Sequence, residues 1–174
     1  MSWMFFIANK LKTKVTKLKI VITKLTMSHH PLFAIITIES EVTILKLNND
    51  CIRDLLLTVE EETGYNKMMI YNNPDYESNN FKLLSKYSYE EMIYHINQCE
   101  KSDLIEVGIS PEEYTTISDL TPKGHKYISD IRSDNVWGKT KSIANKIGAK
   151  SLDAMVQISS NVISEIIKHE FGYL

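Results

Sequence analysis

The chain has 174 residues, of which 43% are hydrophobic and 24% charged, and it contains six glycines and four prolines. Its length excludes a large multidomain protein, and its composition excludes collagen-like and Pro/Gly-rich disordered chains. The formal net charge of −2 conceals an asymmetry. Residues 1–44 hold six Lys against two Glu, a net of +4, whereas residues 45–174 hold 14 Lys plus Arg against 20 Asp plus Glu, a net of −6.

Cysteine usage and hydropathy indicate a reduced, cytoplasmic chain. Cys51 and Cys99 are too few for a disulfide framework and form no Cys-x-x-Cys pair. No stretch reaches the roughly 18 apolar residues that a membrane span needs, so we expect no membrane partner. The apolar opening Met1–Ala8 precedes the lysines, which reverses the order found in a signal peptide.

Residues 1–44 lack a consistent pattern, although Lys12–Ile20 alternates like an edge strand and Phe33–Ile38 is β-branched. A flexible tail and a basic tail touching nucleic acid or membrane are two interpretations. A third is a translated leader, because Ser40–Val42 can be encoded by a purine-rich ribosome-binding run and Leu45 by TTG, an alternative bacterial start. We therefore predict that 1–44 is a disordered or spurious extension and that the natural protein begins near Leu45.

The acidic body opens with two predicted helices. Asn48 or Asn49 suits the N-cap of a helix over 49–62, and residues 65–80 predict a loop with a short strand at Met68–Tyr71. A capping box of Ser88 and Glu91 begins the second helix, over 88–101. Its apolar face holds Tyr89, Met92, Ile93, Ile96 and Cys99, and its polar face holds Glu90, Glu91, Tyr94, Asn97, Gln98 and Lys101.

A β-hairpin over 104–117 and three further helices are predicted next. Thr121-Pro122 is a cap followed by proline at the first helical position, and a later helix stops at Gly148. Ser151 caps the last helix, whose broad apolar stripe runs to about Lys168. This helix either caps the core or pairs with a second subunit in a homodimer.

The order helix, connection, helix, hairpin, helix is that of a winged helix. We predict an α+β fold, with a winged-helix domain over 45–135 and a C-terminal helical extension over 136–174. The passage Tyr89–Ile105 resembles the recognition-helix-to-wing passage of bacterial winged-helix regulators, although Ser102-Asp103 replaces the customary small-Gly pair.

A closer resemblance spans about residues 45–160. It is carried by Leu55–Glu62, Tyr94-His95-Ile96, Asp103-Leu104-Ile105, Leu120-Thr121-Pro122-Lys123-Gly124-His125, Ile131-Arg132 and Val136-Trp137-Gly138-Lys139-Thr140-Lys141. In these motifs the chain resembles the bacterial and prophage family called domain of unknown function 2513. The resemblance implies a winged helix from a phage, prophage or other mobile element, and it implies no activity.

Nothing in the sequence favours an enzyme. There is no Walker loop, no Gly-rich dinucleotide turn and no Gly-x-Ser-x-Gly motif. His95 and Cys99 have the spacing of two metal ligands on one helix, but no third ligand is near in sequence, and Cys99 fits a buried face better. We expect no catalytic residue, no metal and no cofactor.

Two functions remain open. The fold favours a transcriptional regulator that binds double-stranded DNA through the helix over 88–101. The charge favours an acidic adaptor that binds a host or phage protein, because residues 83–135 hold ten acids against five bases. The candidate binding residues under either function are Glu90, Tyr94, Asn97, Gln98 and Lys101, with Lys139 and Lys141 as a small phosphate-facing patch.

Overall fold

The computed structural model describes residues 18–20, 38–40 and 46–172. The chain divides into two compact units, Met1–Ile44 and Leu45–Leu174. In the first unit, strand β1 (Leu18–Ile20) pairs antiparallel with β2 (Ile38–Ser40). The rest of 1–44 lies outside the described residues, so the disordered or spurious extension stays a prediction.

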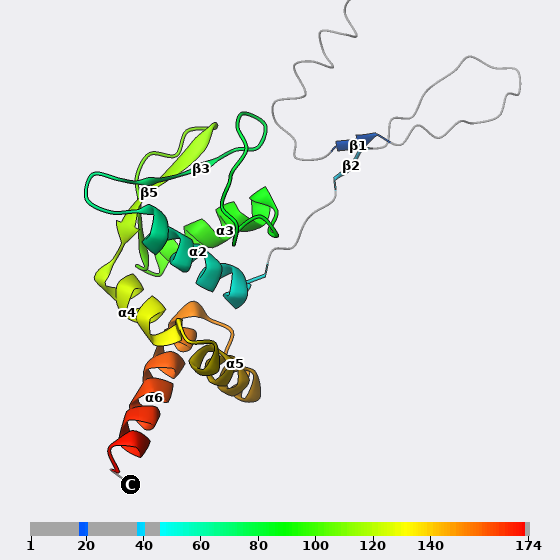
Figure 1. The fold of residues 1–174 in the computed structure, drawn as a ribbon. Coiled ribbons are helices and arrows are strands. Elements are labelled where there is room, and N and C mark those ends of the chain that lie inside the picture. The colour runs from blue at the N-terminus through cyan, green and yellow to red at the C-terminus, as the bar shows by residue number, and fades with distance from the viewer. Residues whose placement is uncertain (1–17, 21–37, 41–45, 173–174) are drawn as a thin grey trace, which may run out of the picture. The chain divides into compact units, whose positions relative to one another are not determined.

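The second unit combines five helices with a small antiparallel sheet (Figure 1). The sheet has the strand order β3-β5-β4. The predicted α+β class is confirmed, and the winged-helix arrangement is compatible with a hairpin that follows α3 directly. The elements are α2 (Asn49–Glu62), β3 (Met69–Asn72), α3 (Tyr89–Lys101), β4 (Ile105–Val107), β5 (Tyr114–Leu120), α4 (Pro122–Ile131), α5 (Asp134–Ile147) and α6 (Leu152–Glu170).

Local signals place the helix ends. The side chains of Asn48, Ser88, Thr121 and Ser151 each accept a hydrogen bond from a backbone N–H in the first turn of the helix that follows. Gly148 ends α5 with a φ of 70°, in the left-handed region that glycine enters without strain. These are the caps that the sequence predicts.

Strand β5 runs three residues beyond the predicted end of the hairpin. It is the central strand, pairing with β3 through Met69 opposite Ile117 and with β4 through Ile105 opposite Leu120. A register shift between Glu106 and Val107 interrupts the second ladder. The polar Ser118-Asp119 pair hides this extension in the sequence, because pairing with β4 rather than β-propensity holds residues 118–120 in the strand.

The core lies between α2, the sheet, α3 and α4. Helix α2 buries four aliphatic side chains, and α3 adds Met92, Ile96 and Cys99. Helix α4 packs so close to Leu104, the residue before β4, that a Cβ on Gly124 would overlap the Leu104 carbonyl oxygen. The largest buried side chains include Ile52, Leu55, Leu56, Leu104, Ile117, Tyr127, Ile128 and Ile131.

The last two helices extend this core. Helix α6 packs on α4 and α5 through Leu152, Met155, Ile158 and Val162, which are all buried. The domain boundary drawn after residue 135 falls inside α5. Among the residues that the structure describes, no helix has both the length and the apolar character that crossing a membrane requires.

Candidate functional site

Five of the seven candidate residues lie on one outward row of α3. Glu90, Tyr94, Asn97, Gln98 and Lys101 follow one another at helical spacing; Asn97 and Lys101 are exposed, and the others are half-buried. The Tyr94 ring meets the His95 ring edge-on, with centroids 5.1 Å apart. Within the described part of the chain, none of the five side chains makes a hydrogen bond or an ion pair, so the row is available to a partner.

The other two candidates, Lys139 and Lys141, lie on α5, away from this row. The Lys141 ammonium donates to Asp50 at 2.8 Å and stands 5.2 Å from the centre of the Trp137 ring. Lys139 lines a groove between α5 and α6. The structure therefore brings the α3 residues together and does not join the two lysines to them in one basic patch.

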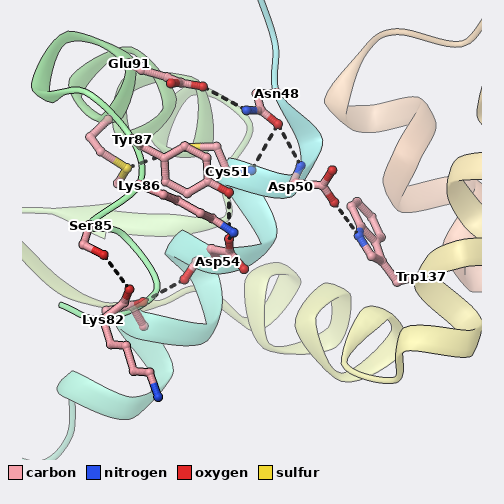
Figure 2. Close-up of polar contacts among 12 residues, drawn as sticks. Asn48, Asp50, Cys51, Asp54, Lys82, Ser85, Lys86, Tyr87, Glu91 and Trp137 are labelled. Atoms are coloured by element: carbon pink, nitrogen blue, oxygen red, sulfur yellow. Dashed lines mark hydrogen bonds and ion pairs between the residues drawn. The ribbon is translucent and has the colours of Figure 1, made fainter.

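The N-terminus of α2 connects α3 to α5, as Figure 2 shows. The Asn48 carboxamide caps α2 with its oxygen and donates through Nδ2 to Glu91 at 2.9 Å. Two residues later, Asp50 accepts from the Trp137 indole N–H and from Lys141, both at 2.8 Å. Burial works to raise the pKa of Asp50, but the hydrogen bonds from Lys141 and Trp137 outweigh it and lower that pKa.

His95 completes this connection. The ring is fully buried, Nδ1 donates to the Glu91 carbonyl at 2.7 Å, and Nε2 accepts the Asn48 backbone N–H at 2.8 Å. An imidazole that accepts at one nitrogen while donating at the other is neutral. Burial lowers the pKa of His95 and thereby favours this form, although the bond to Glu91 opposes the shift.

Cys51, Glu91 and His95 converge, with one ligand atom from each lying within 4.8 Å of the others. In the sequence, the helical spacing pairs His95 with Cys99 instead. It does not reveal Cys51, because 40 residues separate Cys51 from Glu91. Asn48 already bonds both Glu91 and His95. The pKa of Cys51 is raised to about 12, mainly by burial and then by the charge of Glu91, so Cys51 is a thiol at neutral pH. The cluster therefore serves as a hydrogen-bonded contact between α2 and α3.

A buried carboxylate lies one turn along α2. Asp54 is 9% exposed and accepts from the Tyr87 hydroxyl at 2.7 Å and the Lys86 ammonium at 2.8 Å, as Figure 2 shows. Burial and then the bond to Asp54 raise the pKa of Tyr87. Sequence reasoning misses this cluster, although an aspartate among the apolar positions of α2 is a signal for it. It fixes the loop before α3 and thus the start of that helix.

The surface beside the α3 row is acidic. Asn73, in the loop after β3, bonds the backbone of Glu112 and Glu113 at the hairpin tip. The pKa of the exposed Tyr76 is raised, mainly by the charge of Glu112 and then by burial, Glu113 and Asp75. Burial, then Asp75 and Glu90, raises the pKa of Tyr89. We call Asp75, Glu90, Glu112 and Glu113, which surround these two tyrosines, the acidic surface.

Basic side chains do little to offset this charge. Eight of the fourteen Lys and Arg in 45–174 are ion-paired with carboxylates of the body: Arg53, Lys67, Lys86, Lys123, Lys126, Arg132, Lys141 and Lys168. Of the remaining six, only Lys101 belongs to α3. The site therefore presents a polar row with one cation beside a surface of carboxylates.

Comparison with known proteins agrees with the resemblance in the motifs. Searches of curated proteins and of solved structures gave no match. The model of a family described as "Hypothetical protein (DUF2513)" matches residues 46–150, which include α2 through α5. Because this match covers more than half of the chain, the protein belongs to the DUF2513 family.

Proposed function

We propose that this protein is a non-enzymatic winged-helix module that binds a basic surface of a protein partner through the α3 row and the acidic surface. The observation that carries the proposal is the outward row of α3. Its five polar side chains stand side by side and make no side-chain bond within the described residues. Burying these polar side chains in an interface costs free energy unless a partner replaces the hydrogen bonds that they make with water.

The charge around the row selects the class of partner. Helix α3 carries Glu90, Glu91 and Glu100 against Lys101 alone. DNA affinity depends largely on Lys and Arg contacts to phosphate, for which this surface offers only Lys101. Carboxylates complement a basic protein surface, and they speed encounter with it. The acidic surface thus supports an adaptor more than a DNA reader.

A DNA-binding regulator of phage, prophage or mobile-element origin is the second candidate. Asn97 and Gln98 favour it, because both lie on the outward row of a helix that leads into a hairpin. Asn and Gln side chains pair with adenine through two hydrogen bonds when a helix enters the major groove.

Affinity capture from cells that carry the native gene tests the adaptor proposal. The tagged full chain is compared with Glu90→Lys and Glu112→Lys, and with Glu61→Lys as the control, because Glu61 is exposed and lies away from the acidic surface at the end of α2. We expect a protein that the wild type and Glu61→Lys enrich equally and that both test variants lose at least about tenfold. Equal recovery by all four chains would refute the adaptor.

A further inference from the structure

A groove of about 910 Å³ opens between α5 and α6. Its floor is apolar, formed by Ile143 and Ile147 from α5 and by Ile158, Val162 and Ile166 from α6. Ile143 and Ile147 remain 41% and 65% exposed. Removing such side chains from water favours association with another apolar surface.

Helix α6 is longer than the core requires. Its buried residues end at Val162, and the apolar stripe continues through Ile163 and Ile166 to Ile167, which is 49% exposed. Phe171 follows at 72% exposure. Figure 1 shows this end of α6 running away from the other helices. Beyond Val162 the helix therefore has an apolar face that the described part of the chain covers only in part.

The charges of the groove distinguish it from the rest of the body. Its lining holds two lysines, Lys139 and Lys168, and two glutamates, Glu165 and Glu170, whereas residues 45–174 have a net charge of −6. The lone α5 charge is Lys139, whereas α6 supplies Glu165, Glu170 and Lys168, a net of −1. Within the part of the chain that is described, Lys139 has no ion pair, and Glu165 bonds only its helical neighbour Lys168.

The charges of the groove would be complementary between two copies of the chain. In a two-fold dimer each surface meets an identical one, so a basic α5 edge meets an acidic α6 edge twice. A basic protein or a nucleic acid would meet a groove without net charge. The apolar end of a second α6 fits the apolar floor, and the balanced charges avoid the repulsion that two acidic bodies would otherwise impose.

We propose that the α5–α6 groove is a homodimer interface, in which α6 of a second copy lies along the groove and Lys139 of each chain pairs with Glu165 of the other. The dimer leaves the α3 row and the acidic surface free, because neither contributes to the groove. This inference is independent of the proposed function.

Sedimentation velocity on the full chain tests the interface. At about 100 µM we expect a species of about 40 kDa, twice the 20.1 kDa of one chain. Ile147→Glu should give the monomer, whereas Ile109→Glu, at a hairpin isoleucine of nearly equal exposure, 64% against 65%, should leave the dimer intact. A wild-type monomer, or a dimer unaffected by Ile147→Glu, overturns the proposal.

A charge exchange tests the pairing between chains. Lys139→Glu and Glu165→Lys should each lower dimer affinity at least about tenfold, because each places like charges opposite one another. When the two variant chains are mixed, both contacts become complementary again, and the 40 kDa species should return. Misfolded variants would not recover on mixing, so failure of the mixture while circular dichroism shows both chains folded contradicts the pairing.

Discussion

His95 connects two helices through a bond that depends on its charge. Its Nε2 accepts the Asn48 N–H, and a protonated ring has no lone pair with which to accept it. Burial lowers the pKa in the folded chain from the ordinary 6.5, so below that value the unfolded chain binds the proton more readily. The stability that this group contributes is complete above about pH 6.5 and is lost as the pH falls.

Replacing His95 should remove this pH dependence. In His95→Gln a non-titrating carbonyl faces Asn48, so the free energy of unfolding should fall less between about pH 7.5 and pH 5.5 than in the wild type. Urea titrations at each pH measure the difference. His125→Gln, at an exposed histidine, is the matched control for loss of an imidazole. The wild-type slope in His95→Gln would show that His95 does not supply it.

Two helical glycines should respond oppositely to alanine. At Gly124 the new Cβ would overlap the Leu104 carbonyl oxygen, so Gly124→Ala should cost about 1–3 kcal/mol of stability. At Gly138 nothing lies within 4 Å, so Gly138→Ala should gain about 0.5–1 kcal/mol by restricting the unfolded chain. Thermal unfolding of both variants measures this, and a stable Gly124→Ala would contradict the close approach of α4 to Leu104.

At the scale of elements, the N-terminus of α2 holds α5. Asp50→Ala leaves the indole N–H of the buried Trp137 without its partner and should cost about 1–3 kcal/mol. Asp134→Ala is the control, because Asp134 is exposed and its ion pair with Arg53 should be worth less than about 1 kcal/mol. Chemical denaturation compares the two losses, and equal losses would show that Asp50 does not hold α5.

The elements themselves are largely predictable from sequence, because their signals are local. Ser88, Thr121 and Gly148 each cap a helix end within one turn of their own position. The spacing of apolar residues indicates the buried face of each helix. The end of β5 is missed because cross-strand pairing holds it there. Burial of His95 is missed because the residue that satisfies it, Asn48, is on another helix.

The candidate site is predictable only in part for the same reason. The row on α3 follows from helical periodicity, and the structure places its five residues together. Lys141 looks available in sequence, yet Asp50, 91 residues earlier, binds it. Asp54 with Tyr87, and Cys51 with His95, also join distant segments. Contacts of this kind arise from tertiary packing, which the spacing of residues does not encode.

At the scale of the whole molecule, charge distinguishes two surfaces of the body. Ion pairs engage more than half of the basic side chains of the body, which leaves carboxylates dominant around α3 and the hairpin tip. The α5–α6 groove is balanced. We therefore propose a protein partner for the first surface and a second copy of the chain for the other.

Fluorescence anisotropy with a labelled random-sequence DNA duplex at low salt tests most directly our proposal that the α3 surface does not bind DNA. We predict that Asn97→Ala and Lys101→Ala leave the DNA affinity of the full chain unchanged. Glu90→Lys combined with Glu112→Lys should raise that affinity, because it reverses the charge that repels phosphate. A loss of about tenfold or more in Asn97→Ala or Lys101→Ala would contradict the proposal and establish α3 as a DNA-binding helix.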